Sequence, residues 1–321
     1  MNSNKYDKFT NNIFVEYLKE KRSLGYKYDD EELILLRFDN YCNENNISLL
    51  NLKKSDLDNW CSKRNSEGNN YLYKRVLVVK QFLFYLLSLG YNVFIPNIRV
   101  TRETRLPHIF TEDEIIELFT IIDNYCPETN SRDIIRLANE YKVMFRLIYC
   151  CGLRNSECCN IKIDDIDVDN RSINILNSKG NKDRVVYMPE DINNLCKKYL
   201  SYISDTIKSE SYFLFPGLDA KKAIPNTSID RVFTRYLNLT SFAKKCNNKP
   251  RVHDLRFTFV TKKINEWAQK NINFETMMPY LKSYLGHKNI QDTYYYYHIS
   301  DELYGSIHSN DTIGQSIIPD I

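Results

Sequence analysis

The sequence lacks a long apolar run and begins with a polar segment. Its longest apolar stretch, around residues 82–95, is interrupted by Ser88, Gly90 and Asn92 and is too short to cross a bilayer. The first residues, MNSNKYDKFTNN, do not resemble a secretory signal. These absences predict a protein of the reducing cytoplasm without a membrane segment.

The nine cysteines also lack the C-x-x-C spacing of a structural zinc site. Cys150 and Cys151 form one adjacent pair, and Cys158 and Cys159 form another. We therefore predict buried or partly buried free thiols and expect no metal.

A strong net charge is missing as well, because the formal charge is only +3. The charge is unevenly spread: residues 1–105 hold 17 Lys and Arg against 13 Asp and Glu, and the remainder holds 27 against 28. A nucleic-acid-binding surface would have to be built from local patches.

Apolar residues recur at helical spacing in four segments of the first part of the chain. The segments are 7–23, 29–45, one that begins near Ser55, and 70–89. Ser55 is expected to cap the third helix, with Asp58 at its third position. Four helices in this length predict a small helical bundle.

Basic side chains lie on the fourth predicted helix and in the segment after it. For these residues phosphate contact competes with an ordinary solvated surface. The candidates for DNA contact are Lys74, Arg75, Lys80, Arg99, Arg102 and Arg105.

A second domain is expected to begin just after residue 105. Thr111 and Glu114 have the spacing of a capping box before an apolar run. Residues 134–150 then read as a buried helix that ends at Gly152. Segments 171–175 and 184–189 are typical of strands, so the domain is predicted to be mainly helical with a small β-sheet.

Phosphate chemistry is indicated by four later motifs. They are GLRNSE at 152–157, SKG at 178–180, HDLR at 253–256 and LGHKNIQDTYYYYHIS at 285–300. Arginine offers a flat fork of donors matched to phosphate oxygens, and His253 and Arg256 share one helical face. A tyrosine hydroxyl can attack a phosphate that such cations hold and neutralise.

Arg, Lys, His-x-x-Arg, Gly-His and Tyr in this order resemble the active site of the tyrosine recombinases, which include the phage-type integrases and Xer-like recombinases. The resemblance covers roughly the C-terminal two thirds of the chain. It implies a SAM-like helical core-binding domain at 1–105, with a basic linker, that clamps DNA. It also implies an α+β catalytic domain at 106–321.

The resemblance assigns roles to individual residues. Glu157 would support the site, and His287 would donate to the phosphate. Lys179 would be the general acid for the leaving 5′-oxygen, with Lys182 as its competitor, and His253 could take the tyrosine proton. The nucleophile follows the Gly-His histidine by nine positions, which selects Tyr296 among the four tyrosines. The implied catalytic residues are Arg154, Lys179, His253, Arg256, His287 and Tyr296.

The implied reaction cuts and rejoins DNA through a 3′-phosphotyrosyl bond without a cofactor. Expected partners are double-stranded DNA with inverted-repeat core sites and further copies of the chain, a dimer to tetramer on DNA. The acidic tail after His298 would dock on a neighbouring copy, with a frayed end as the alternative. Other readings are a type IB topoisomerase, a relaxase-like nickase and a non-catalytic DNA-binding factor of the same fold.

Overall fold

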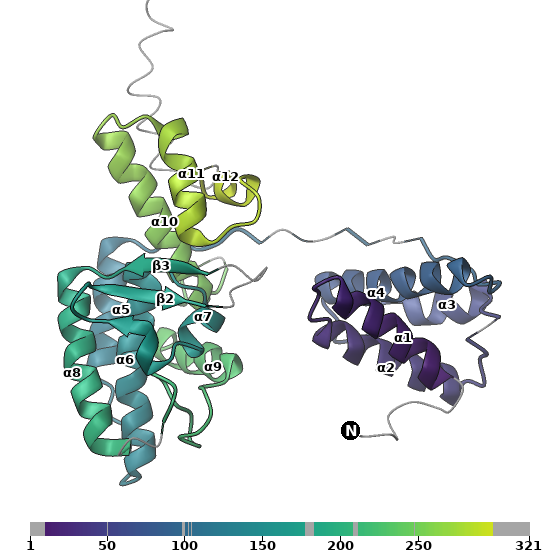
Figure 1. Ribbon diagram of the computed structural model, residues 1–321, viewed down its shortest axis with the longest axis horizontal. Coiled ribbons are helices and arrows are strands. Elements are labelled where there is room, and N and C mark those ends of the chain that lie inside the picture. The colour runs from purple at the N-terminus through teal and green to yellow at the C-terminus, as the bar shows by residue number, and fades with distance from the viewer. Residues whose placement is uncertain are drawn as a thin grey trace, which may run out of the picture. The chain divides into compact units, whose positions relative to one another are not determined.

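The computed structural model describes residues 10–49, 51–97, 100–101, 103, 105–176, 183–207, 211–246 and 248–297. The chain forms two compact units, Met1–Arg105 and Leu106–Ile321, which are described separately (Figure 1). All nine cysteines are free thiols, and every one except the exposed Cys126 is buried or partly buried. Within the described residues, no helix has the length and apolar character needed to span a membrane.

The described residues of the first unit form four helices around one apolar core. Their bounds are α1 Thr10–Ser23, α2 Asp29–Glu44, α3 Lys54–Cys61 and α4 Asn69–Ser88. Phe14 stacks on Phe82 with 4.5 Å between ring centroids, and Phe38 meets Trp60 edge-on at 5.0 Å. These aromatic side chains are fully buried, so they contribute strongly to the apolar burial that holds the helices together.

Helix α3 begins one residue before the predicted cap. Lys53 occupies the cap position, and its backbone N–H donates to the Asp56 carboxylate at 2.9 Å. The prediction that Ser55 caps this helix with Asp58 at the third position is therefore wrong. The aspartate that receives the cap hydrogen bond lies two residues earlier than expected.

Arg75 does not lie on the surface of this unit. Its side chain is fully buried, and Nε and Nη2 donate to the two carboxylate oxygens of Glu67 at 2.7 Å each. Further donors reach the carbonyl oxygens of Trp60 and Ser62. The prediction that Arg75 contacts DNA is wrong, because its donors are used inside the fold.

The remaining basic candidates differ in their surroundings. Lys74 forms ion pairs with Asp30 at 2.9 Å and Glu31 at 3.3 Å. Lys80 lies over the exposed Phe84 ring, 5.9 Å from its centroid. Arg105 is partly buried, and the predicted contacts Arg99 and Arg102 lie outside the described residues.

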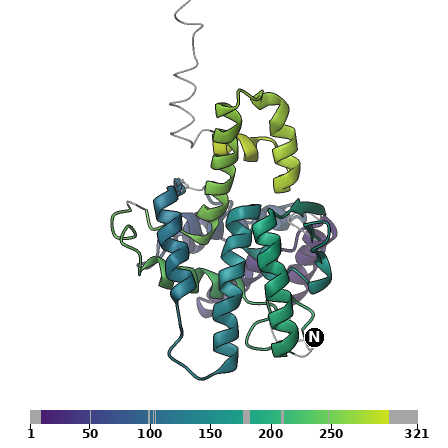
Figure 2. The ribbon, with the colours of Figure 1, turned by 90° about the vertical axis from the view of Figure 1, so that its left-hand side faces the viewer.

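The second unit is mainly helical with a small sheet, which confirms the predicted fold class. Helix α6 contacts α5 and α8, which run alongside it (Figure 2). The helices are α5 Glu112–Asn124, α6 Arg132–Cys151, α7 Asn155–Cys159, α8 Glu190–Ile207, α9 Asn226–Leu237, α10 Val252–Gln269, α11 Phe274–Leu285 and α12 Gln291–Tyr297, with a 3-10 turn Ile163–Asp165. The predicted capping box at the start of α5 is present, since the Glu114 N–H donates to Thr111 Oγ1 and the Thr111 N–H to the Glu114 carboxylate.

The sheet is antiparallel with the strand order β1-β2-β3. Its strands are Ile166–Asp167, Ser172–Ile175 and Arg184–Tyr187, and Ile173 pairs with Val186. The two predicted strand segments therefore pair with each other. The residues predicted to form their turn, including Lys179 and Gly180, lie outside the described part of the chain.

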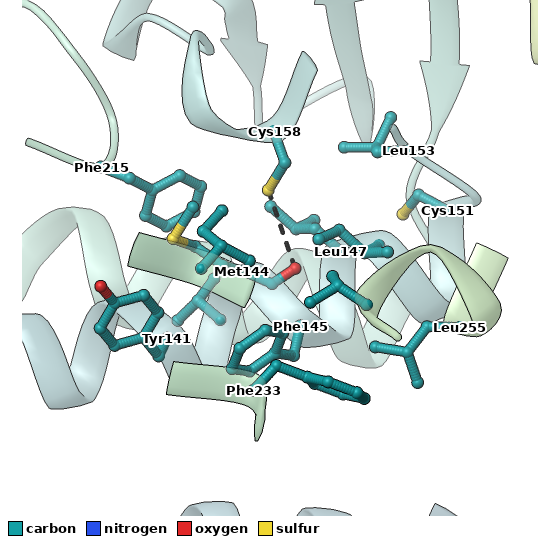
Figure 3. Packing of buried hydrophobic residues seen from close by; sticks show 14 of the residues in the cluster. Tyr141, Met144, Phe145, Leu147, Cys151, Leu153, Cys158, Phe215, Phe233 and Leu255 are labelled. Carbon is teal, nitrogen blue, oxygen red and sulfur yellow. Dashed lines mark hydrogen bonds between the residues drawn. The ribbon is translucent and has the colours of Figure 1, made fainter. Parts of the chain in front are cut away.

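Two apolar cores are present in this unit. The larger one surrounds α6 and includes Met144, Phe145, Phe233 and Leu255 (Figure 3). The smaller one is formed by α10, α11 and α12, which lie together beyond β3 in Figure 1. Helix α10 supplies residues to both cores, so it links the body of the unit to the helix pair α11 and α12.

The buried Arg75–Glu67 pair leads to a stability prediction. In a Trp267→Phe chain, where Trp60 fluorescence reports on the first unit, Arg75→Met should lower the urea-unfolding free energy by about 3 kcal/mol or more. The loss is expected because Glu67 would remain buried without its partner. Lys74→Met is the matched control and should lose at most about 1 kcal/mol, because its ion pairs are exposed. Equal losses in the two variants would contradict a structural role for Arg75.

Candidate active site

The site is built around the buried carboxylate of Glu157 in α7. Oε1 accepts from Arg154 Nη1 at 2.6 Å and from Arg184 Nη1 at 2.9 Å, and Oε2 accepts from Arg184 Nη2 at 2.8 Å. Arg256 Nη1 lies 3.8 Å from Oε2. Three guanidinium groups therefore meet at one carboxylate.

Arg154 is placed by the turn between α6 and α7. Gly152 ends α6 with φ +65, and a Cβ there would lie 2.5 Å from the Phe259 ring, so both the backbone and the packing require glycine. The Arg154 N–H then donates to Glu157 Oε2 at 2.9 Å and starts α7. Arg154 Nη2 donates to the Gly286 carbonyl at 3.0 Å.

Arg256 enters from α10 and is fully buried. Nη1 donates to the Gly152 carbonyl at 2.6 Å, and Nη2 donates to the Leu285 carbonyl at 2.9 Å. Burial lowers the Arg256 pKa from its usual value, while the Tyr296 hydroxyl within hydrogen-bonding reach opposes this shift. Arg256 therefore joins the ends of α6 and α11 and also reaches the candidate nucleophile.

His287 is held in one neutral form between two partners. Arg256 Nη2 lies 3.2 Å from His287 Nε2, and the Thr293 hydroxyl lies 2.8 Å from Nδ1. Arginine can only donate, so Nε2 accepts and the proton resides on Nδ1. Burial and the neighbouring Arg256 lower the His287 pKa to about 3, which agrees with this neutral form.

Among the tyrosine side chains of α12 that the structure describes, Tyr296 is the one packed into the site. Its ring is nearly parallel to His287 with 5.7 Å between centroids, and it lies 4.5 Å from Phe257. Tyr295 is exposed, and Tyr294 packs against Phe274. The Tyr297 side chain lies outside the described part of the structure.

His253 lies one helical turn before Arg256 and packs edge-on against Phe257 at 5.3 Å. Burial, reinforced by Arg256, lowers the His253 pKa to about 4. The imidazole is therefore neutral at pH 7 and able to accept a proton. Phe257 contacts both His253 and Tyr296, so it fixes the separation of the two rings.

The structure thus brings five of the six predicted catalytic residues and Glu157 into one region, while Lys179 lies outside the described residues. Arg184 is the residue that sequence reasoning missed. Beyond its two contacts with Glu157, its Nε donates to the Tyr284 carbonyl at 2.7 Å. A signal existed in the strand, because Arg184 shares the two-residue alternation of the buried Val186 and Met188. An arginine on an inward-facing position requires a buried anionic partner.

Comparisons with known proteins agree with this architecture. The profile of the Phage integrase family matches residues 109–302. The tyrosine recombinase XerC of Staphylococcus aureus is 25% identical over 309 residues, which is 95% of both chains. Two solved structures share the fold with a TM-score of 0.62. XerH bound to palindromic difH substrate is 20% identical and covers 88% of this chain and 78% of its own. The Tn1549 transposon integrase in complex with transposon right end DNA is 16% identical. The match covers 88% of this chain and 94% of the integrase chain.

His253, which is partly buried, and the buried His287 predict a dependence of stability on pH. Their pKa values are lowered to about 4 and about 3 in the folded chain from 6.5 in the unfolded chain. Below pH 6.5 the unfolded chain therefore binds more protons, so the unfolding free energy should decrease as the pH falls toward 4. Urea unfolding followed by circular dichroism between pH 7.5 and 5 measures the slope. His287→Asn should reduce that slope, and an identical slope in both proteins would contradict the assignment.

Proposed function

The chain belongs to the phage integrase family, the tyrosine recombinases, and from this premise we propose that it is a site-specific DNA recombinase whose nucleophile is Tyr296. The single observation that carries the assignment is the position of Tyr296. Its ring packs on His287, whose Nε2 lies 3.2 Å from Arg256 Nη2. A nucleophile beside a cluster of arginines is the arrangement that phosphoryl transfer requires.

In the proposed reaction the Tyr296 oxygen attacks a DNA phosphate and forms a 3′-phosphotyrosyl bond. The bond from phosphorus to the 5′-oxygen breaks, and Lys179 protonates the leaving oxygen. The tyrosine proton passes to His253, which is neutral at pH 7 because burial lowers its pKa to about 4. A free 5′-hydroxyl from a partner strand then reverses these steps and reseals the DNA. Arg154 and Arg256 hold the phosphate oxygens, and His287 orients Arg256 by accepting from its Nη2 group, so the charge of the transition state is balanced by guanidinium groups.

The proposed substrate is double-stranded DNA with inverted-repeat core sites. XerH binds a palindromic site and the Tn1549 integrase binds a transposon end, which supports this substrate and a role in moving a mobile element. A palindrome presents the same half-site twice, so at least two copies of the chain would bind, with a tetramer when two sites are paired. The reaction would take place in the cytoplasm.

The two units are proposed to have different roles. Met1–Arg105, with its basic linker, would bind the DNA, and Leu106–Ile321 would catalyse strand cleavage and rejoining. Lys80, Arg99, Arg102 and Arg105 remain proposed DNA contacts, and Lys74 would have to exchange its ion pairs with Asp30 and Glu31 for a phosphate. The tail after His298, outside the described residues, is proposed to dock on a neighbouring copy.

Replacing the nucleophile tests the function. Tyr296→Phe should bind DNA but form no covalent adduct on a nicked suicide substrate, because only the attacking oxygen is lost. Tyr295→Phe is the matched control and should form adducts at the normal rate, since Tyr295 is exposed. The measurement is the adduct band on a denaturing gel. Adducts that persist in Tyr296→Phe would refute the assignment, and relaxation without strand exchange would indicate a topoisomerase.

Arg184 is expected to act as a positioning residue. Arg184→Met removes two of the hydrogen bonds that hold Glu157, so adduct formation should slow by about 10²-fold while DNA affinity is retained. Arg184→Lys should recover part of the rate, because the charge returns without the two-pronged geometry. Arg171 supplies the control, since its side chain is 43% exposed and its ion pair with Glu190 is long, at 3.8 Å. Equal adduct rates in Arg184→Met and Arg171→Met would remove Arg184 from this role.

A further inference from the structure

We propose that His108, Glu114 and Cys246 bind a divalent transition-metal ion, with Zn²⁺ as the best fit to their donor atoms. One imidazole nitrogen, one carboxylate oxygen and the thiol sulfur all lie within 4.8 Å of one another. Nitrogen, oxygen and sulfur from these three side chains are the ligands that zinc takes in proteins. Within the part of the chain that the structure describes, no other group of three such donors is this close.

The three residues converge from separate parts of the second unit. His108 precedes α5, Glu114 is the third residue of α5, and Cys246 follows α9. All three line a cavity of about 380 Å³. Cys246 is more than a hundred residues from the other two in the sequence, so no spacing motif could have revealed the group.

Each donor is already oriented by neighbours in the fold. Glu114 Oε2 accepts from the Thr111 N–H at 3.0 Å and lies 2.9 Å from His108 Nε2. The His108 ring is parallel to Phe242 at 6.3 Å, and the Cys246 thiol donates to the Phe242 carbonyl at 3.5 Å. Phe242 therefore holds the histidine and the cysteine in the same cavity.

The adjustment needed to accept an ion is small. Two ligands bound to zinc at tetrahedral angles lie about 3.3 Å apart. His108 Nε2 and Glu114 Oε2 would thus move apart by about 0.4 Å from their present 2.9 Å. The thiol would approach by rotation about its Cα–Cβ bond. Water would complete the fourth position, as it does when a protein supplies three ligands.

Charge balance explains why the ion must be a dication that favours thiolate. A cysteine binds a metal ion as the thiolate, so uptake of the metal must release the Cys246 proton. Thiolate and carboxylate would then neutralise the two charges of the ion. Lys245 also lines the cavity and would disfavour any cation held without both negative ligands.

The consequence of binding would be structural. The Phe110 N–H donates to Thr258 Oγ1 at 3.0 Å, which ties the segment of His108 to α10, two residues beyond Arg256. An ion at the proposed site would join this segment to α5 and to the loop after α9. The site is thus separate from the residues assigned to strand cleavage and independent of the proposed recombinase function.

Cobalt titration of the full-length chain, untagged, reduced and stripped with chelator, tests the site without DNA. Co²⁺ should bind one per chain and produce a thiolate-to-cobalt charge-transfer band with intense tetrahedral d–d bands, which Zn²⁺ then removes. Cys246→Ser should abolish the charge-transfer band. His108→Gln should weaken Co²⁺ binding by at least about tenfold, the scale for disturbing a metal site. Cys126→Ser is the matched control, because it removes an exposed thiol.

Two results would overturn the proposal. A charge-transfer band that survives in Cys246→Ser would place the ion on another cysteine. Weak, octahedral-type spectra without the thiolate band would show that the chain has no such site. Circular dichroism of the variants separates loss of a ligand from loss of the fold.

Discussion

The carboxylate of Glu157 is the constraint on which the rest of the site depends. It is buried and receives hydrogen bonds from Arg154 and Arg184, with Arg256 at 3.8 Å. These arginines come from the turn before α7, from β3 and from α10, so one anion fixes three separate elements. A DNA phosphate bound here would accept hydrogen bonds from guanidinium groups that Glu157 already orients, so the structural carboxylate also prepares the site for its substrate.

The arginines are also held by the ends of two helices. Arg256 donates to the carbonyls of Gly152 and Leu285, and Arg154 donates to that of Gly286. Helix C-termini present carbonyl oxygens without intrahelical partners and carry partial negative charge. Both glycines adopt left-handed backbone angles, which end α6 and α11 where the arginines need acceptors. A Cβ on Gly286 would lie 3.0 Å from Arg184 Nη1, so the glycine at the end of α11 also leaves room for the Arg184 guanidinium group. The acceptors that orient the cations are therefore parts of the fold itself.

Several local features were predictable from the sequence, although the cap of α3 was not, and side-chain positions that depend on tertiary burial were missed. The capping box at Thr111 and the turn at Gly152 follow from local backbone chemistry, and both are present. Arg75 carries the same charge as Lys74 one position earlier. It nevertheless points into the core, because the Glu67 carboxylate and two backbone carbonyls accept its hydrogen bonds there. Helical periodicity gives no information about such a partner. Arg184 was missed for a related reason, since its partner Glu157 lies 27 positions away.

The division of apolar packing explains how the nucleophile can be positioned separately from the cations. Leu255 packs into the large core around α6, whereas Phe259 and Val260 pack with Tyr296 in the smaller core. Arg256 lies between these two sets of contacts on one rigid helix. The segment that carries Arg154 and Glu157 packs into the larger core through Leu153 and Cys158, whereas Tyr296 of α12 packs into the smaller one. Helix α10 contributes to both cores, and it therefore fixes the position of Arg256 relative to Tyr296.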